Sequence, residues 1–176
     1  MRLPRAPFDD FSEVVPRAVA TAGIAERRER TPRADRPLGR HDADMLTRVP
    51  LFAGLSRRDL RRLAEHADVV LFRPREAIVQ AGRPGGTFYV VLQGEANVVL
   101  NDRTIGYLRP GDFFGEISLL DGGPRTASVV ADTPVTAIRI FKRSFDRVIS
   151  EEPTVAAKIL AVVAKRLRQA ERSITG

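Results

Sequence analysis

The sequence contains no cysteine, no tryptophan and only two histidines, His41 and His66, among its 176 residues. Without cysteine the chain can form neither disulfides nor thiolate metal sites, and two histidines are too few for a multi-histidine metal centre. Metalloenzymes that depend on histidine clusters are thereby excluded. We expect no metal and no catalytic residues, and therefore a protein that is not an enzyme.

Long hydrophobic runs are also missing. No stretch of about 18 apolar residues is present, which is the length that a membrane-spanning helix requires. The segment Phe8–Phe11 places two aspartates where a signal peptide would have its apolar core. We expect a soluble protein of the cytoplasm with no membrane segment.

The net charge is +7, with 29 lysines and arginines against 22 acidic residues. Such an excess invites a nucleic-acid interpretation, but residues 1–44 are nearly balanced, with nine arginines and eight acids. Much of the excess lies near the C-terminal end of the sequence, where cations suit the end of a helix, and we interpret them as a solvated helix face. These cations are Lys158, Lys165, Arg166, Arg168 and Arg172, opposed by Glu171.

Residues 1–44 mix proline, arginine, aspartate and alanine without periodicity, and we interpret them as a flexible N-terminal extension. Residues 31–39 have the composition of a linker or a disordered segment, and a short helix is compatible with residues 18–30. A docking peptide for a partner and a plain flexible tail are both compatible with this composition. We expect one folded domain over residues 45–176.

The folded part begins with a helix signal and continues with strand signals. Ser56 can cap a helix, and Asp59 at its third position completes a capping-box pattern. Short apolar runs separated by glycine, proline, asparagine and aspartate turns then predict an antiparallel sandwich or barrel. The expected strands are 69–72, 77–79, 88–92, 96–100, 105–108, 127–130 and 135–140. The predicted class is mainly β, an antiparallel jelly-roll barrel over about residues 69–141 with flanking helices.

Helical periodicity returns after Phe141, with helices predicted over 144–149 and from Pro153 onwards. On the last helix, apolar residues recur at alternating steps of four and three, which is the spacing of a coiled-coil seam. The seam consists of Ala156, Leu160, Val163, Leu167, Ala170 and Ile174. It is compatible with a homodimer formed through this helix and equally with packing on the chain's own barrel.

The stretch from Phe113 to Ser128, FFGEISLLDGGPRTAS, combines unusual residue types. A helical turn over Ile117–Leu120 would present free backbone N–H groups to an anion, and Arg125 could bind the same anion as a forked donor. Glu116 would repel that anion unless it accepted a hydrogen bond from a hydroxyl of the same ligand. A phosphate joined to a ribose meets both requirements, whereas a structural Arg–Glu ion pair is the simpler alternative.

Two segments carry a resemblance to a known family: Gly111–Leu120, GDFFGEISLL, and Pro124–Ser128, PRTAS. Together they resemble the phosphate-binding cassette of the cyclic nucleotide-binding domain family, found in cyclic-AMP receptors and in regulatory subunits of protein kinases. We call residues 113–128 the cassette. The resemblance extends from about residue 45 to residue 171 and includes Phe88–Ala96, which is similar to a glycine-turned hairpin of the family.

The resemblance implies a role for each cassette position. Glu116 would accept a hydrogen bond from the ribose 2′-hydroxyl, helped by the Gly115 N–H, and Arg125 would pair with the cyclic phosphate. The backbone N–H groups of Ser118 and Thr126 would complete the cradle, with Ile117 and Ala127 as its remaining members. The implied ligand is cAMP, and the Thr126 hydroxyl is also compatible with cGMP.

The resemblance implies a non-enzymatic sensor in which the C-terminal helix closes over the base and signals to a protein effector that the sequence does not identify. Leu160, Val163 and Leu167 are candidates for the capping residue. One alternative is a degenerate scaffold domain that binds no nucleotide. Another is a transcription regulator, but no helix-turn-helix follows the last helix, and DNA binding is not expected. A jelly-roll enzyme would need a histidine cluster.

Overall fold

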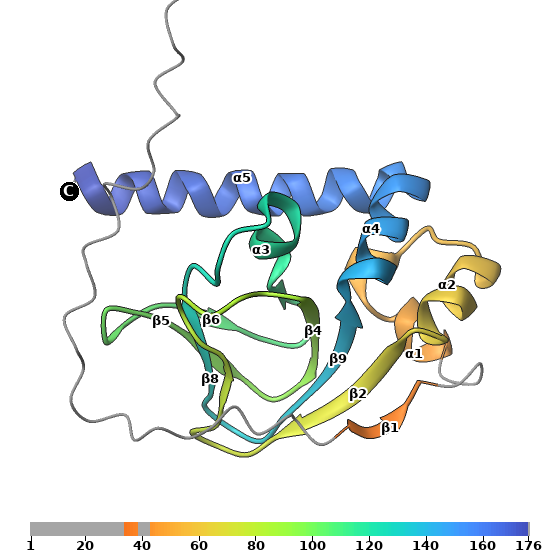
Figure 1. The fold of residues 1–176 in the computed structure, drawn as a ribbon, viewed down its shortest axis with the longest axis horizontal. Coiled ribbons are helices and arrows are strands. Elements are labelled where there is room, and N and C mark those ends of the chain that lie inside the picture. Colours follow the sequence, from red (N-terminus) through yellow and green to blue (C-terminus); the bar gives the residue numbers. More distant parts are fainter. Residues whose placement is uncertain (1–33, 39–42, 176) are drawn as a thin grey trace, which may run out of the picture. The chain divides into compact units, whose positions relative to one another are not determined.

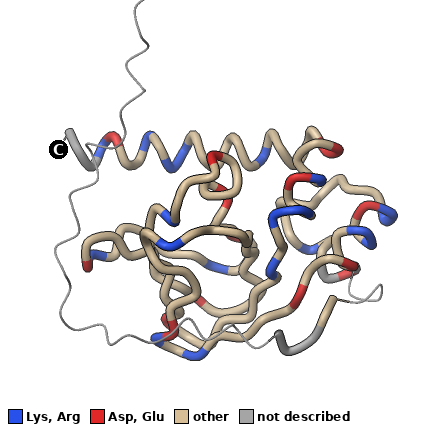
Figure 2. The backbone as a smooth tube through the Cα atoms, in the orientation of Figure 1, with Lys and Arg blue, Asp and Glu red and all other residues tan. Residues whose placement is uncertain are grey.

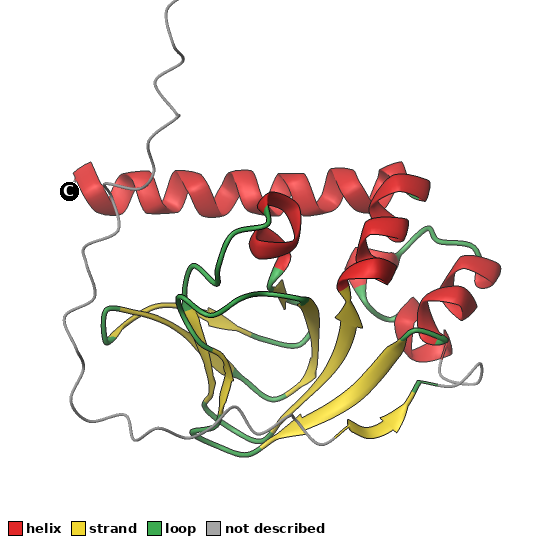
Figure 3. Cartoon of the chain, in the orientation of Figure 1, coloured by secondary structure: helices red, strands yellow, loops and turns green. Residues whose placement is uncertain are grey.

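The computed structural model describes residues 34–38 and 43–175, which fold into two antiparallel sheets with helices at one end and along one side (Figures 1 and 3). The strands are β1 Ala34–Pro37, β2 Ala67–Phe72, β3 Ala77–Val79, β4 Thr87–Gln93, β5 Ala96–Leu100, β6 Arg103–Leu108, β7 Phe113–Phe114, β8 Ser128–Ala131 and β9 Val135–Phe141. The helices are α1 Ala43–Thr47, the 3₁₀ helix η3 Pro50–Phe52, α2 Arg57–Ala64, α3 Glu116–Asp121, α4 Lys142–Glu151 and α5 Pro153–Thr175.

The two sheets have the strand orders β1-β2-β9-β4-β7 and β3-β8-β5-β6. In the larger sheet β9 is central and pairs with β2 through Val69↔Ile138 and with β4 through Val90↔Ile138. Strands far apart in the sequence are thus neighbours, as in a β-roll. The expected class, mainly β with an antiparallel roll and flanking helices, is confirmed.

Alternate residues of the central strands face two different clusters of buried side chains. On β4, Phe88 and Val90 join the cluster beneath the helices, whereas Tyr89 and Val91 join the cluster between the sheets. Because successive side chains of a strand point to opposite faces, a strand buried on both faces must be apolar throughout. This explains why the run Phe88–Leu92 is continuously apolar instead of alternating.

The N-terminal part of the described chain requires a correction. Residues 34–37 form β1, which pairs with β2, and Leu38 is buried with its N–H donating to the Ala67 carbonyl. The expected linker is therefore wrong for residues 34–38. Residues 1–33 and 39–42, including the helix considered over 18–30, lie outside the described residues, so the N-terminal extension and its boundary at residue 44 stay predictions.

The start of α2 follows the expected pattern. Ser56 precedes the helix with extended backbone angles, and its hydroxyl accepts a hydrogen bond from the Asp59 N–H at 3.2 Å. The same hydroxyl donates to the Asp59 carboxylate, so Ser56 and Asp59 hold the first turn together. Leu60 and Leu63 then face the core, as helical spacing requires.

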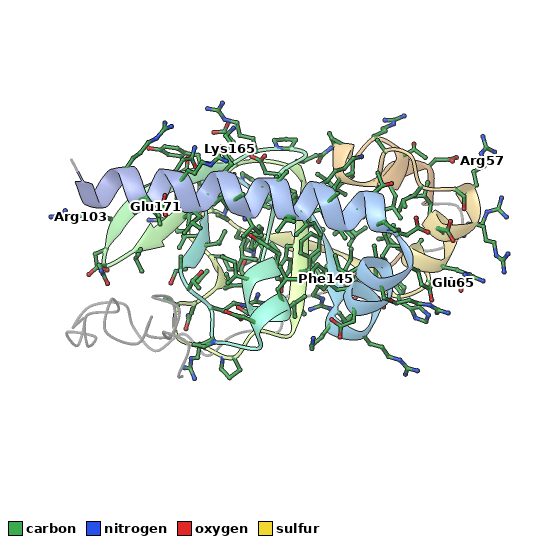
Figure 4. The ribbon with its side chains drawn as sticks, turned by 90° about the horizontal axis from the view of Figure 1, so that it is seen from above. Arg57, Glu65, Arg103, Phe145, Lys165 and Glu171 are labelled. Atoms are coloured by element: carbon green, nitrogen blue, oxygen red, sulfur yellow. The ribbon has the colours of Figure 1, made fainter. Side chains whose placement is uncertain are left out.

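Helix α5 lies along one side of the sheets and buries a narrow stripe of its surface (Figures 1 and 4). Val155 and Ile159 belong to the cluster beneath the helices, together with Phe145 of α4, which Figure 4 shows beside α5. The Lys158 ammonium donates to the Pro50 and Ala53 carbonyls of η3, at 3.0 and 2.7 Å. These contacts hold the N-terminal half of α5 on the domain.

The predicted seam of α5 faces away from this contact over much of its length. Leu160 and Leu167 are 69% and 53% exposed, whereas Val163 is half-buried and packs against the core. The residues that contact the domain belong to the neighbouring stripe at Val155, Ile159 and Val162. Within residues 34–38 and 43–175, no helix combines the length and the apolar character that crossing a membrane demands.

Candidate functional site

The cassette connects β7 to β8 and includes the short helix α3. Gly115 directly precedes α3 and has a φ of +88°. Residues other than glycine rarely adopt this left-handed conformation, because their Cβ atom clashes with the backbone. A Cβ atom on Gly115 would lie only 2.7 Å from both Arg125 Nη1 and the Thr87 carbonyl oxygen. Both the backbone angle and the close approach therefore require glycine at this position.

Arg125 lies against this glycine and is 6% exposed. Its Nη1 donates to the Gly115 carbonyl at 3.1 Å, and its Nη2 donates to the Thr87 carbonyl at 2.8 Å and to Thr87 Oγ1 at 2.9 Å. Its backbone N–H donates to the Arg83 carbonyl, which fixes the position of the chain. The guanidinium is thus held by β4 and by the start of α3, two segments far apart in the sequence.

Glu116 is the first residue of α3 and is 1% exposed. Its carboxylate accepts a hydrogen bond from Arg166 of α5, whose second terminal nitrogen donates to the Phe113 carbonyl. The Arg166 guanidinium also lies 5.3 Å from the centre of the Phe113 ring. A buried carboxylate requires such a partner, because an unpaired charge in a low-dielectric site is costly.

The remaining predicted site residues differ in how far their side chains are buried. Ser118 is buried and its hydroxyl donates to the Pro124 carbonyl at 3.3 Å, Ile117 and Ala127 are half-buried, and Thr126 is exposed. The structure thus brings Gly115, Glu116, Ser118 and Arg125 into one buried arrangement. Of the other apolar residues of α3, Leu119 is buried in the core, whereas Leu120 is 52% exposed.

Three residues of this arrangement were not identified from the sequence: Thr87, Phe113 and Arg166. The interpretation of Arg166 as part of a solvated helix face is wrong, because its side chain is only 32% exposed and bonds Glu116 and Phe113. One signal could have found it. Arg166 follows the buried Ile159 by seven residues and Val162 by four, so it lies on the same helix face.

Chemically, the site offers one buried carboxylate and one buried guanidinium close to backbone N–H groups. This combination suits a ligand that carries both a hydroxyl donor and an anion. Across the described ranges of the chain, no group of three or more histidine, aspartate or glutamate residues is arranged to hold a metal ion.

Comparison with known proteins identifies the family that the domain resembles. Residues 69–152 match the family model described as cyclic nucleotide-binding domain. A cAMP-dependent protein kinase regulatory subunit of Colletotrichum orbiculare is 35% identical over 108 residues, which cover 60% of this chain and 28% of the relative. The cyclic AMP receptor protein of Thermus thermophilus is 32% identical over 127 residues, 69% of this chain and 59% of the relative.

A solved structure, the catabolite activator protein of Thermus thermophilus, matches with a TM-score of 0.62 and 32% identity, covering 72% of this chain and 62% of that one. The chain spans less than a third of the kinase regulatory subunits that it resembles. The named relatives are regulatory subunits and cAMP-responsive regulators. Through residues 69–152 and the fold that contains them, this chain carries a cyclic nucleotide-binding domain.

Proposed function

We propose that this chain is a non-enzymatic cyclic nucleotide sensor that binds cAMP at the cassette. The observation that carries the proposal is the placement of Arg125 and Glu116 on either side of Gly115, with the guanidinium 3.1 Å from the Gly115 carbonyl and the carboxylate at the first residue of α3. One ligand that carries an anion and a hydroxyl a few bonds apart can address both groups.

In this proposal the Glu116 carboxylate accepts the ribose 2′-hydroxyl, and Arg125 donates to the cyclic phosphate. The backbone N–H groups of Gly115, Ser118 and Thr126 complete the cradle, with Ile117 and Ala127 as flanking members. Burial supports these roles, because hydrogen bonds to ionised groups gain strength where water is excluded. The exposed Thr126 hydroxyl is available to a guanine amino group, so cGMP is a second ligand of the same site.

The output of the sensor is a rearrangement of α5. This helix contributes Arg166 to the cassette, so a ligand that displaces or rearranges the cassette changes the position of α5. The exposed seam residues Leu160 and Leu167 offer a surface to a second copy of the chain or to a protein effector. We propose homodimerisation through this seam.

The second candidate is a scaffold domain that binds no nucleotide. It is favoured by one observation: Arg125 already donates to Gly115 and Thr87, and Glu116 is already paired with Arg166. Hydrogen bonds of this kind within the domain can stabilise the fold without any role in ligand binding. The two candidates differ in whether a ligand exchanges for these internal partners.

Calorimetric titration with cAMP and with cGMP separates the candidates. The sensor predicts binding at micromolar or tighter affinity, with the heat greatly reduced in Arg125→Lys, which keeps the charge but loses the forked donor. Because Arg125 also holds Thr87 and Gly115, thermal unfolding of the variant must show that the domain stays folded. Absence of heat for both nucleotides with the folded wild type would leave the scaffold as the function.

A further inference from the structure

Helix α2 carries four of the chain's arginines within its eight residues. Arg57, Arg58 and Arg61 are exposed and Arg62 is half-buried, whereas the leucines of the helix face the core. At about 100° per residue, the four side chains fall within an arc of roughly 140° on the solvent side of α2. Figure 2 shows these cations along the helix, and Figure 4 shows Arg57 extending away from the ribbon. We call these four residues the arginine face.

The arginine face does not stabilise the helix that carries it. Arg57 and Arg58 lie in the first turn of α2, where the helix dipole disfavours cations. Each of them has a second arginine four residues further on, and like charges at this spacing repel each other. Within residues 34–38 and 43–175, none of the four arginines forms an ion pair with a carboxylate. Local electrostatics therefore opposes this cluster of charge, and an anionic partner would relieve it.

A pocket beside the arginine face adds an apolar surface. The pocket lies between α2 and α4, and its apolar lining comes from Leu55, Leu63 and Val148. Arg62 lines the same pocket, so the arginine face and the pocket form one continuous surface. A partner that covered both would contact cations on one side and apolar side chains on the other.

The make-up of this surface distinguishes between classes of anionic partner. Nucleic acid needs no apolar pocket, and its evenly charged backbone would be repelled by the pocket carboxylates Asp59, Glu151 and Glu152. Helices that bind membranes insert large apolar side chains, and among the described residues those of α2 expose none. An acidic protein segment meets both conditions, because it can direct its carboxylates to the arginines and an apolar side chain into the pocket.

We propose that the arginine face and the adjoining pocket bind an acidic segment of a partner protein, with an apolar side chain of that segment between α2 and α4. None of these residues belongs to the cassette, so the inference stands apart from the proposed function. It gives the domain a protein contact that depends on charge complementarity and does not involve α5.

The probe is a fluorescein-labelled peptide of glutamates with two leucines four positions apart, and fluorescence anisotropy measures its binding to the full chain. We expect saturable binding at protein concentrations up to about 100 μM, weakening as NaCl screens the charges. The double variant Arg57→Gln, Arg58→Gln should lose at least about tenfold in affinity, the loss expected for two surface ion pairs. Its Tm should equal or exceed that of wild type, because repulsion within α2 is reduced.

The matched control is the double variant Arg103→Gln, Arg168→Gln, which removes the same charge from exposed positions outside α2. Its affinity for the peptide should stay within about twofold of wild type. Equal losses in the two double variants would overturn the proposal, because the peptide would then respond only to net charge. Loss of stability together with loss of binding in the α2 variant would also overturn it, since the arginines would then serve the fold.

Three further outcomes would contradict the proposal. Wild-type protein that did not bind the peptide would remove the acidic partner. Equal affinity for a peptide with serine in place of both leucines would remove the role of the pocket. Tighter binding of duplex DNA or of phosphatidylserine vesicles, lost in the same α2 variant, would assign the arginine face to nucleic acid or to a membrane surface instead.

Discussion

Gly115 is the residue at which the cassette leaves no room for a side chain. Its φ of +88° and the 2.7 Å that would separate a Cβ atom from Thr87 O and Arg125 Nη1 act together. We predict that Gly115→Ala lowers the free energy of unfolding by about 3 kcal/mol, the sum of left-handed backbone strain and overpacking. Denaturant unfolding measures this loss, and cAMP binding should weaken in parallel.

Gly122 provides the control for this prediction. It has a similar φ of +73° at the other end of α3, but a Cβ atom there would have no neighbour within 4 Å. Gly122→Ala should therefore cost only about 1 kcal/mol from backbone strain and leave cAMP binding unchanged. Equal losses in the two variants would mean that contact with Arg125 and Thr87 is unimportant.

The pair of Arg139 and Asp68 joins β9 to β2 away from the cassette. Arg139 Nη2 donates to Asp68 Oδ2 at 2.7 Å, the guanidinium lies 5.0 Å from the centre of the Phe141 ring, and Arg139 is 8% exposed. Asp68→Ala would leave this buried cation without its carboxylate and should destabilise the domain by about 3 kcal/mol. Asp68→Ala combined with Arg139→Met should recover much of that loss in the same unfolding experiment. If stability did not recover, the loss in Asp68→Ala would come from altered packing and not from the unpaired charge of Arg139.

At the scale of residues, the sequence predicts which cassette residues form the candidate site, but it does not predict which residues elsewhere in the chain they contact. The order of Gly115, Glu116 and Arg125 along the chain predicts a site for a ligand that carries an anion and a hydroxyl, before any contact is known. The bond from Arg166 to Glu116 joins residues 50 positions apart and depends on how α5 lies on the domain. On an amphipathic helix, the local sequence does not distinguish an arginine that pairs with a buried carboxylate from one that is solvated.

At the scale of elements, strands with strong apolar runs and helices with capping signals were predictable. Strands β2 to β6, β8 and β9 follow the expected runs within a few residues, and α2 begins directly after Ser56. Strand β1, ADRP in sequence, has no β-type composition and exists because its backbone pairs with β2. The formation of such a strand depends on pairing with a neighbouring strand and not on the β-propensity of its own residues.

Helix α5 carries the prediction of self-association. If the exposed seam pairs two copies, Leu167→Glu should place a charge in an apolar interface and convert a dimer to a monomer, as measured by sedimentation equilibrium. The fold should survive, because Leu167 is 53% exposed on the single chain. Arg168→Glu, at the adjacent exposed position, serves as the control and should leave the dimer intact. Wild-type protein that is monomeric at high micromolar concentration would contradict the seam as an interface.

On the scale of the whole molecule, positive and negative side chains are intermixed along the described chain (Figure 2). The net charge of +7 does not by itself identify a nucleic-acid site. The two buried clusters share the strands β2, β4 and β9, so the barrel and the helical layer should unfold together.

This shared core gives the ligand a global effect. A nucleotide at about 100 times its Kd should stabilise the folded state by about 2.7 kcal/mol, which raises the Tm by roughly 5–10 °C for a domain of this size. Differential scanning fluorimetry with increasing cAMP measures the shift, and adenosine, which lacks the phosphate, is the matched ligand control. A shift of the same size with adenosine would show that Arg125 does not bind the phosphate.

The most direct test of a cyclic nucleotide site at the cassette changes the ligand and leaves the protein intact. We would measure the affinity of the wild-type chain for cAMP, for its 2′-deoxy analogue and for adenosine by isothermal titration calorimetry. The account predicts micromolar or tighter binding of cAMP and at least a tenfold loss for each analogue, about 1.4 kcal/mol or more for each deleted contact. Equal affinity for all three, or no binding of cAMP, would contradict it.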